Sequence, residues 1–184
     1  MRRTLPESDN PASPDGEALW RVARGDASAI GEVYDRHARA LLRFATRLHG
    51  AADAEDIVQT VFVRAAHQAP TYDSRISSAR SWLFGITALV IKERRRALAR
   101  MVRALVRFGA SSPPPQMPPY GQRRDIARGL ATLSEVQRMV LLSSDVEGFA
   151  GEEIATMLNV PVGTVWTRLH HARRKVREFL SEGQ

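Results

Sequence analysis

Hydrophobic residues recur at three- and four-residue spacing along most of the chain, with polar and charged residues between them. This spacing places the apolar residues on one face of an α-helix, and no segment shows the alternation that is typical of a strand. The pattern predicts helices over residues 15–24, 26–49, 53–69, 79–108, 124–131, 134–142, 150–158 and 161–180. The predicted fold class is therefore all-α.

The segment between residues 109 and 122 contains five of the ten prolines of the chain, so it cannot continue a helix. We interpret it as a Pro-rich linker between two small helical domains, over residues 16–108 and 123–184. Residues 1–15 hold three prolines and no apolar period, which predicts a disordered tail. The second domain is predicted to contain four helices, and Ser134 with Gln137 forms a capping box at the start of one of them.

The helix predicted over residues 79–108 is the longest. Its candidate inward residues are Trp82, Leu83, Ile86, Val90, Leu98, Met101 and Leu105. Its second half is strongly basic, with seven cations and one anion from Lys92 to Arg107. A second cluster, from Thr164 to Glu178, has five cations and one anion, whereas the whole chain of 184 residues carries a net charge of only +7. Two basic helical clusters on an otherwise slightly acidic chain favour a nucleic-acid partner.

Composition excludes several other classes of protein. The chain has no Cys, which rules out disulfides, thiolate nucleophiles and Cys-ligated zinc. Charges interrupt every apolar run before the roughly 20 residues that span a bilayer, and residues 4–15 lack the apolar stretch of a signal peptide. Scattered histidines and the absence of a nucleophile elbow or a Gly-rich phosphate loop predict no metal, no cofactor and no catalysis. We expect a protein of the cytoplasm with no membrane insertion.

Residues 152–169 have the pattern of a helix-turn-helix, with Asn159 at the turn and Pro161 at the start of the second helix. The outward row of that helix is Thr164, Trp166, Thr167, Arg168, His171 and Arg174. Its first turn is expected to enter a major groove, and its later arginines to reach phosphates. The alternative is a helical hairpin with a solvated charged face.

Two features of the first domain admit two interpretations each. Asp53, Glu55 and Asp56 stand in the first turn of a helix, where they either stabilise the helix dipole or form a docking patch for a basic partner. The loop from Tyr72 to Trp82 combines aromatic and basic residues, as surfaces that bind unpaired bases do, although Trp82 also suits the core.

Taken in order, these segments resemble the extracytoplasmic-function (ECF) group of sigma-70-type sigma factors over about residues 17–182. The motifs that carry the resemblance are Asp53-Ala-Glu-Asp-Ile-Val-Gln, Arg80-Ser-Trp-Leu-Phe-Gly-Ile, Leu133-Ser-Glu-Val-Gln-Arg-Met-Val-Leu-Leu, Glu152-Glu-Ile-Ala and Val160-Pro-Val-Gly-Thr-Val. The resemblance implies a subunit that binds core RNA polymerase and directs promoter-specific initiation. It also implies promoter DNA and an anti-sigma factor as partners.

The resemblance assigns three sets of site residues. The polymerase-binding set, for the coiled-coil clamp of the largest subunit, is Asp53, Glu55, Asp56, Gln59 and Phe62. The set that melts and reads the minus-ten element is Tyr72, Arg75, Arg80, Trp82, Leu89, Lys92, Arg95 and Arg96. The set that reads the minus-thirty-five element is Thr164, Trp166, Thr167, Arg168, His171 and Arg174.

Three residues depart from the family pattern in ways that affect DNA or polymerase contacts. Leu89 replaces a frequent Asn and cannot form bidentate hydrogen bonds with a base. Thr60 replaces a carboxylate, and Trp166 replaces a Lys or Arg, which exchanges a polar contact for an apolar one. The alternative functions are a stand-alone, dimeric helix-turn-helix regulator and a resolvase-type enzyme, which would need strands and a positioned Ser nucleophile.

Overall fold

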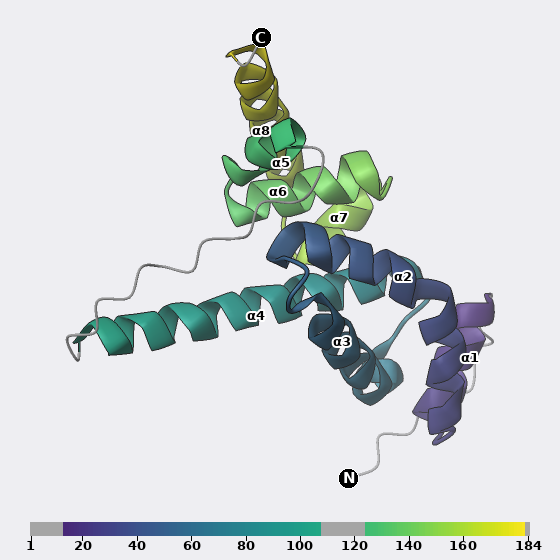
Figure 1. Ribbon diagram of the computed structural model, residues 1–184. Coiled ribbons are helices and arrows are strands. Elements are labelled where there is room, and N and C mark those ends of the chain that lie inside the picture. The colour runs from purple at the N-terminus through teal and green to yellow at the C-terminus, as the bar shows by residue number, and fades with distance from the viewer. Residues whose placement is uncertain (1–12, 108–123, 183–184) are drawn as a thin grey trace.

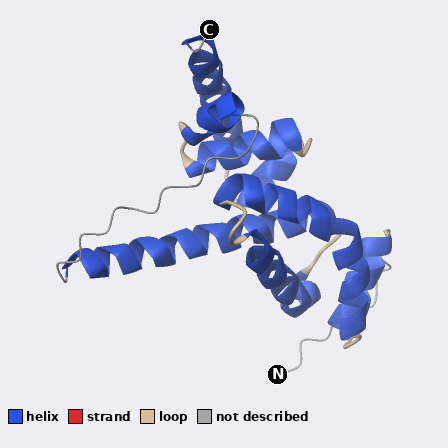
Figure 2. Ribbon diagram, in the orientation of Figure 1, coloured by secondary structure: helices blue, strands red, loops and turns tan. Residues whose placement is uncertain are grey.

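The computed structural model describes residues 13–107 and 124–182, and within these ranges the chain is helical with no strand (Figure 2). The helices are α1 (Pro14–Ala23), α2 (Ile30–His49), α3 (Ala54–Gln68), α4 (Ala79–Arg107), α5 (Arg124–Ala131), α6 (Glu135–Leu141), α7 (Gly151–Leu158) and α8 (Val162–Glu182). Short 3₁₀ turns at Ala27–Ala29 and Ala69–Thr71 and a π turn at Leu142–Val146 join some of them. The predicted all-α class is confirmed.

Local capping explains where several helices begin and end. Ser13 Oγ accepts a hydrogen bond from the Gly16 amide (3.1 Å) at the start of α1, and Asp26 Oδ1 accepts one from the Ser28 amide (3.2 Å) in the turn before α2. The predicted capping box of α6 is present, because Ser134 and Gln137 bond reciprocally at 3.3 and 3.0 Å. Asn159, at φ 49°, ends α7 in the left-handed conformation that its short polar side chain tolerates.

The tail predicted over residues 1–15 differs from the structure at its end. Ser13 caps α1, and Pro14 and Asp15 stand in its first turn. The N–H that Pro lacks would have no partner at this position, and the charge of Asp15 interacts favourably with the helix dipole. Residues 1–12 and the predicted linker over 109–122 lie outside the described residues.

α1, α2, α3 and the first half of α4 form one bundle, and α5–α8 lie on one side of it, where α7 packs against α4 and α6 contacts α2 (Figure 1). The second half of α4 continues past the bundle as a projecting arm (Figure 1). The inward positions predicted for that half are wrong at two residues: Leu98 is 40% exposed and Met101 60% exposed. Leu98 and Met101 continue the apolar spacing of α4, but the helices that bury Leu83 and Val90 do not extend along the arm, so no described helix covers the two residues there.

A row of three phenylalanines joins the two packed parts. Phe84 of α4 is fully buried, with its ring centroid 4.8 Å from that of Phe44 in α2 and 5.0 Å from that of Phe149, which precedes α7. Such tilted and edge-on pairs are favourable beyond the area they bury. The hydrophobic core is therefore continuous between the first four helices and the last four.

No helix in the described ranges combines the length and the apolar composition needed to cross a membrane.

Candidate nucleic-acid interface

The first turn of α3 carries an acidic patch, which we define as Asp53, Glu55 and Asp56. All three side chains are exposed, as is Gln59. Asp53 does not cap the helix with its side chain; its carboxylate lies 3.3 Å from Nε2 of His49 at the end of α2. Capping by hydrogen bond therefore does not explain Asp53, whereas the charges of Glu55 and Asp56 still favour the helix dipole.

Phe62, the fifth member of the predicted polymerase-binding set, is only 7% exposed. Its ring centroid lies 4.8 Å from that of Tyr34 in α2, and Tyr34 is 44% exposed. Phe62 thus supports the packing of α3 on α2, and Tyr34 presents the outer ring of this pair. The side chain of Thr60, where the family pattern has a carboxylate, donates to the Asp56 carbonyl (2.7 Å).

The loop before α4 is held by its own side chains. Tyr72 is half-buried, donates to the Ser77 carbonyl (3.2 Å) and lies 5.1 Å, centroid to centroid, from the half-buried ring of Trp82. Burial raises the pKa of Tyr72. Arg75 binds Asp73 through two guanidinium hydrogen bonds of 2.9 and 2.8 Å, and this pairing lowers the pKa of Asp73 to about 2. The predicted minus-ten residues of the loop are therefore brought together, with Arg75 most exposed.

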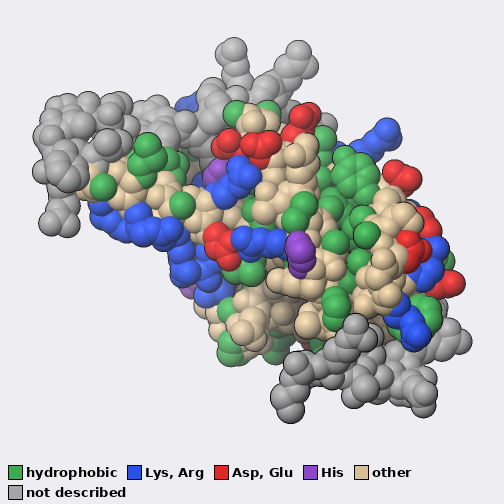
Figure 3. Space-filling view, turned by 90° about the horizontal axis from the view of Figure 1, so that it is seen from below, with side chains coloured by type: hydrophobic (Ala, Val, Ile, Leu, Met, Phe, Trp, Pro, Cys, Tyr) green, Lys and Arg blue, Asp and Glu red, His purple; other side chains and the backbone are tan. Residues whose placement is uncertain are grey.

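On α4, the predicted minus-ten residues fall into two groups. Leu89, Lys92 and Arg96 are exposed. Arg80 and Arg95 are instead paired with carboxylates of the second half of the chain, Arg95 with Glu135 at 3.0 Å. Lys and Arg side chains gather along the arm of α4 in Figure 3, so the arm is the basic edge of this part of the molecule.

Glu147 is the carboxylate that receives Arg80. Its side chain is 7% exposed and accepts from Arg80 at 3.1 Å and from Arg47 of α2 at 3.4 Å, while its carbonyl accepts from Arg80 at 3.0 Å. The Arg80 guanidinium also lies over the rings of Phe84 and Phe149, at 5.1 and 4.2 Å from their centroids. We call this arrangement of Arg47, Arg80 and Glu147 the interdomain clasp. Glu147 was not among the predicted site residues, because a single Glu in a turn carries no signal of its partners.

A groove of about 940 Å³ lies between α4 on one side and α6 and α7 on the other. Its apolar lining comes from both sides and includes Trp82, Leu89, Val136, Met139, Met157 and Val160. Lys92, Arg96 and Arg168 are cations at the same groove. Beside it α7 approaches α4 closely at Gly85, where a Cβ would lie 3.1 Å from the Met157 carbonyl oxygen.

α7 and α8 form the predicted helix-turn-helix. Ile154, Val165 and Leu169 are buried between them, and the Val160 amide donates to the Ala155 carbonyl (3.0 Å) across the turn. α7 begins without a Ser or Thr cap, because Ala150 precedes it. The backbone amide of Ala150 donates a hydrogen bond to the Glu153 carboxylate (2.9 Å). The second helix is thus fixed in orientation by an apolar contact and a tight turn.

The six residues predicted to face outward on α8 are not equally exposed. Trp166, Thr167, His171 and Arg174 are exposed, whereas Thr164 and Arg168 are half-buried. Arg168 lines the groove against α4. Trp166 is 51% exposed, and its ring takes the space where Gly151 would carry a Cβ, which would lie 2.4 Å from its Cζ2.

In the described ranges, no three His, Asp or Glu side chains are grouped as metal ligands would be.

Two family models match the chain, one on each side of the predicted linker. Sigma-70 region 2 matches residues 33–101, which run from α2 into the arm of α4. Sigma-70 region 4 matches residues 123–176, which include α5, α6, α7 and most of α8. The two matches include most of the acidic, basic and helix-turn-helix features described above.

Similar proteins agree with these matches. The ECF RNA polymerase sigma factor SigL of Mycobacterium tuberculosis is 38% identical over 166 residues, which cover 88% of this chain and 94% of SigL. SigE of Mycolicibacterium smegmatis is 33% identical, over 92% of this chain and 69% of its own length. The solved structure of CnrH in complex with the cytosolic domain of CnrY superposes with a TM-score of 0.68 at 26% identity, over 94% of this chain and all of CnrH. The chain belongs to the ECF group of sigma-70 RNA polymerase sigma factors, which direct transcription initiation.

Proposed function

We propose that this sigma factor is a dissociable subunit of RNA polymerase whose two domains contact different ligands. Residues 16–108 bind the polymerase clamp and the unpaired minus-ten strand, residues 123–184 bind the duplex minus-thirty-five element, and residues 109–122 link them. The polymerase performs all catalysis, and the chain acts in the cytoplasm, where it meets polymerase and chromosome.

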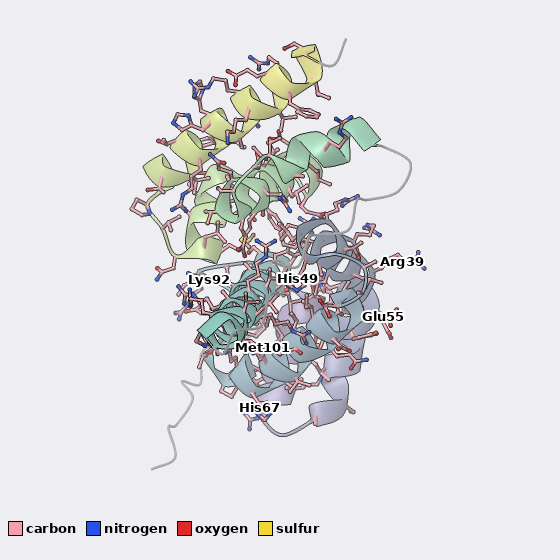
Figure 4. The ribbon with its side chains drawn as sticks, turned by 60° about the vertical axis from the view of Figure 1, so that its left-hand side comes forward. Arg39, His49, Glu55, His67, Lys92 and Met101 are labelled. Carbon is pink, nitrogen blue, oxygen red and sulfur yellow. The ribbon has the colours of Figure 1, made fainter. Side chains whose placement is uncertain are left out.

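The observation that carries this proposal is the placement of charge on the first four helices. Glu55 of the acidic patch and Lys92, where the basic half of α4 begins, lie on opposite sides of the bundle (Figure 4). A partner that binds the acidic patch therefore leaves the basic half of α4 open. This geometry supports simultaneous contact with a polymerase and with DNA.

The test is transcription by core RNA polymerase on a library of random promoters, with and without the chain. We expect the added chain to select templates that share two sequence blocks at a constant spacing. The proposal would be contradicted if the transcribed templates showed no enriched sequence blocks. Enrichment of two inverted copies of one block, bound by the chain without polymerase, would favour the dimeric regulator instead.

The interdomain clasp bears on how the minus-ten set acts. The guanidinium of Arg80 is occupied by Glu147, and that of Arg95 by Glu135. A DNA phosphate would therefore compete with a carboxylate for either cation. Among the members of the set on α4, the exposed residues Leu89, Lys92 and Arg96 are therefore the most accessible to DNA in the described conformation.

Reversing the charge of Glu55 is expected to weaken the binding of core polymerase by about tenfold or more, because like charges facing each other across an interface are strongly unfavourable. The matched control is Glu17→Arg. Glu17 and Glu55 are both exposed and both lie in the first turn of a helix, so each change loses the same interaction with a helix dipole. The affinity is measured by titrating labelled chain with core polymerase.

Only Glu55→Arg should lower this affinity, while both variants should melt alike. Equal affinities for the two variants would contradict docking through the acidic patch.

The groove between α4 and α6–α7 supports an anti-sigma factor as a further partner. CnrH was solved with the cytosolic domain of CnrY bound to it. An apolar lining with Lys92, Arg96 and Arg168 beside it fits an amphipathic helix with an acidic face. A partner in this groove would cover residues of both predicted DNA-binding sets at once.

We expect a photoreactive amino acid at Leu89 or Val136, two exposed apolar residues on opposite sides of the groove, to cross-link to one and the same protein in the source cell. The control position is Val63, which is 58% exposed on α3, away from the groove. Mass spectrometry identifies the adducts. Groove positions that capture only polymerase subunits, or the same proteins as Val63, would contradict this assignment.

A further inference from the structure

The charges of α8 are separated along the helix. In its first ten residues, 162–171, the only Lys or Arg is Arg168, and this side chain is half-buried against the groove that faces α4. Four cations follow between residues 173 and 177, and all four are exposed: Arg173, Arg174, Lys175 and Arg177. The helix thus has a neutral N-terminal end and a basic distal end. The basic end suits phosphates, and the neutral end is the part that enters a major groove.

The exposed side chains at the neutral end are apolar or carry hydroxyl or imidazole groups. Val162 is 38% exposed and Trp166 51% exposed, and they stand one helical turn apart on the same face. Thr167 is exposed beside them, with its hydroxyl donating to the Gly163 carbonyl at 2.9 Å. Bidentate recognition of guanine needs Arg or Lys, and that of adenine needs Asn or Gln. None of these four residue types is exposed within residues 162–171.

Trp166 is held in place by its contact with α7. A Cβ on Gly151 would lie 2.4 Å from Cζ2, 2.7 Å from Cη2 and 2.9 Å from Cε2 of the indole. The ring therefore packs on the backbone at the first residue of α7, and this contact requires a glycine there. A flat apolar ring that is fixed on one edge and half-exposed can contact a base without the entropy cost of ordering a flexible side chain.

We propose that Trp166, together with Val162, recognises thymine in the upstream promoter element through the C5 methyl group. This inference rests on the proposed function, since it takes the duplex minus-thirty-five element as the ligand. The methyl is the apolar group that a base pair presents in the major groove, and apolar side chains are its partners. Gly151 is a positioning residue, because it makes the space in which the indole is held.

The experiment uses holoenzyme assembled from core polymerase and the full chain, on a promoter obtained from the random library. Each thymine of the upstream element is replaced in turn by deoxyuridine, which removes the methyl and keeps every hydrogen-bonding group. We expect the deoxyuridine substitution to lower the affinity of the holoenzyme about fourfold at one or two positions. This fold-change corresponds to about 0.8 kcal/mol, the contribution of one buried methylene-sized group. At those positions Trp166→Ala should bind thymine and deoxyuridine equally.

Gly151→Ala is the second variant, because its new Cβ would overlap the indole of Trp166 from a buried position and displace it. It should lose the discrimination while keeping the affinity for non-specific duplex, which depends on the distal cations. The conservative variant Trp166→Phe should retain part of the discrimination.

Wild-type holoenzyme that binds both bases equally at every position would overturn the inference, as would discrimination that survives in Trp166→Ala. These outcomes leave the sigma-factor function standing. A holoenzyme that selects no upstream element from the library would instead overturn the proposed function, and the inference with it.

Discussion

Replacing Phe84 with Ala is expected to lower the free energy of unfolding by about 3–5 kcal/mol. The ring is fully buried, and it packs between Phe44 and Phe149 with the guanidinium of Arg80 above it. Its removal leaves a cavity at the point where the core passes from the first four helices to the last four. Because a domain is stable by only about 5–15 kcal/mol, this change takes away a large part of the total.

Urea unfolding followed by circular dichroism at 222 nm measures the effect. Met101→Ala is the matched control, because Met101 lies on the same helix and is 60% exposed, so its truncation should change stability by no more than about 0.5 kcal/mol. A Phe84→Ala variant as stable as Met101→Ala would contradict the placement of Phe84 in a shared core.

Glu147→Ala is expected to weaken the packing of the two halves by about 1–3 kcal/mol, because it removes the acceptor that Arg47 and Arg80 share. Each arginine side chain is 38% exposed, so water compensates part of the loss and keeps the cost below that of a fully buried pair. The effect should appear first as separation of the halves, since the carboxylate lies in the second half and both cations in the first.

The absence of native Cys makes this separation measurable by fluorescence energy transfer between two introduced cysteines. Val63→Cys on α3 and Arg177→Cys on α8 are exposed positions, one in each half. We expect the energy transfer to decrease at a lower urea concentration in Glu147→Ala than in the parent protein. Glu152→Ala, an exposed carboxylate of the same half, should behave like the parent. Equal midpoints for all three proteins would show that the clasp does not hold the halves together.

Local features of the fold were predictable from the sequence because they depend on neighbours in the chain. The capping box of Ser134 and Gln137 and the left-handed Asn159 involve residues within a few positions of each other, and both predictions are confirmed. The hydrophobic period predicted the helices for the same reason. It was wrong for Leu98 and Met101, because a period shows which face of a helix is apolar and not whether another helix covers that face.

Features that depend on distant residues were not predictable in this way. Phe62 was assigned to the polymerase-binding set, yet it packs against Tyr34 of another helix. Trp166 was assigned to DNA contact, but the packing of its ring on Gly151 depends on the crossing of α7 and α8. Glu147 meets Arg47 across 100 residues of sequence, and one sequence offers no signal for such a pairing. The polymerase and DNA contacts of these sets stay predictions.

The central claim is that this chain supplies the promoter contacts, including those with the unpaired minus-ten strand, while polymerase performs the catalysis. Permanganate reactivity of thymines in the minus-ten region tests it most directly, because only unpaired thymines react. On a promoter selected from the library, we expect reactivity when chain and core polymerase are both present, and none with either alone. Reactivity with core polymerase alone, or none with the two together, would contradict the account.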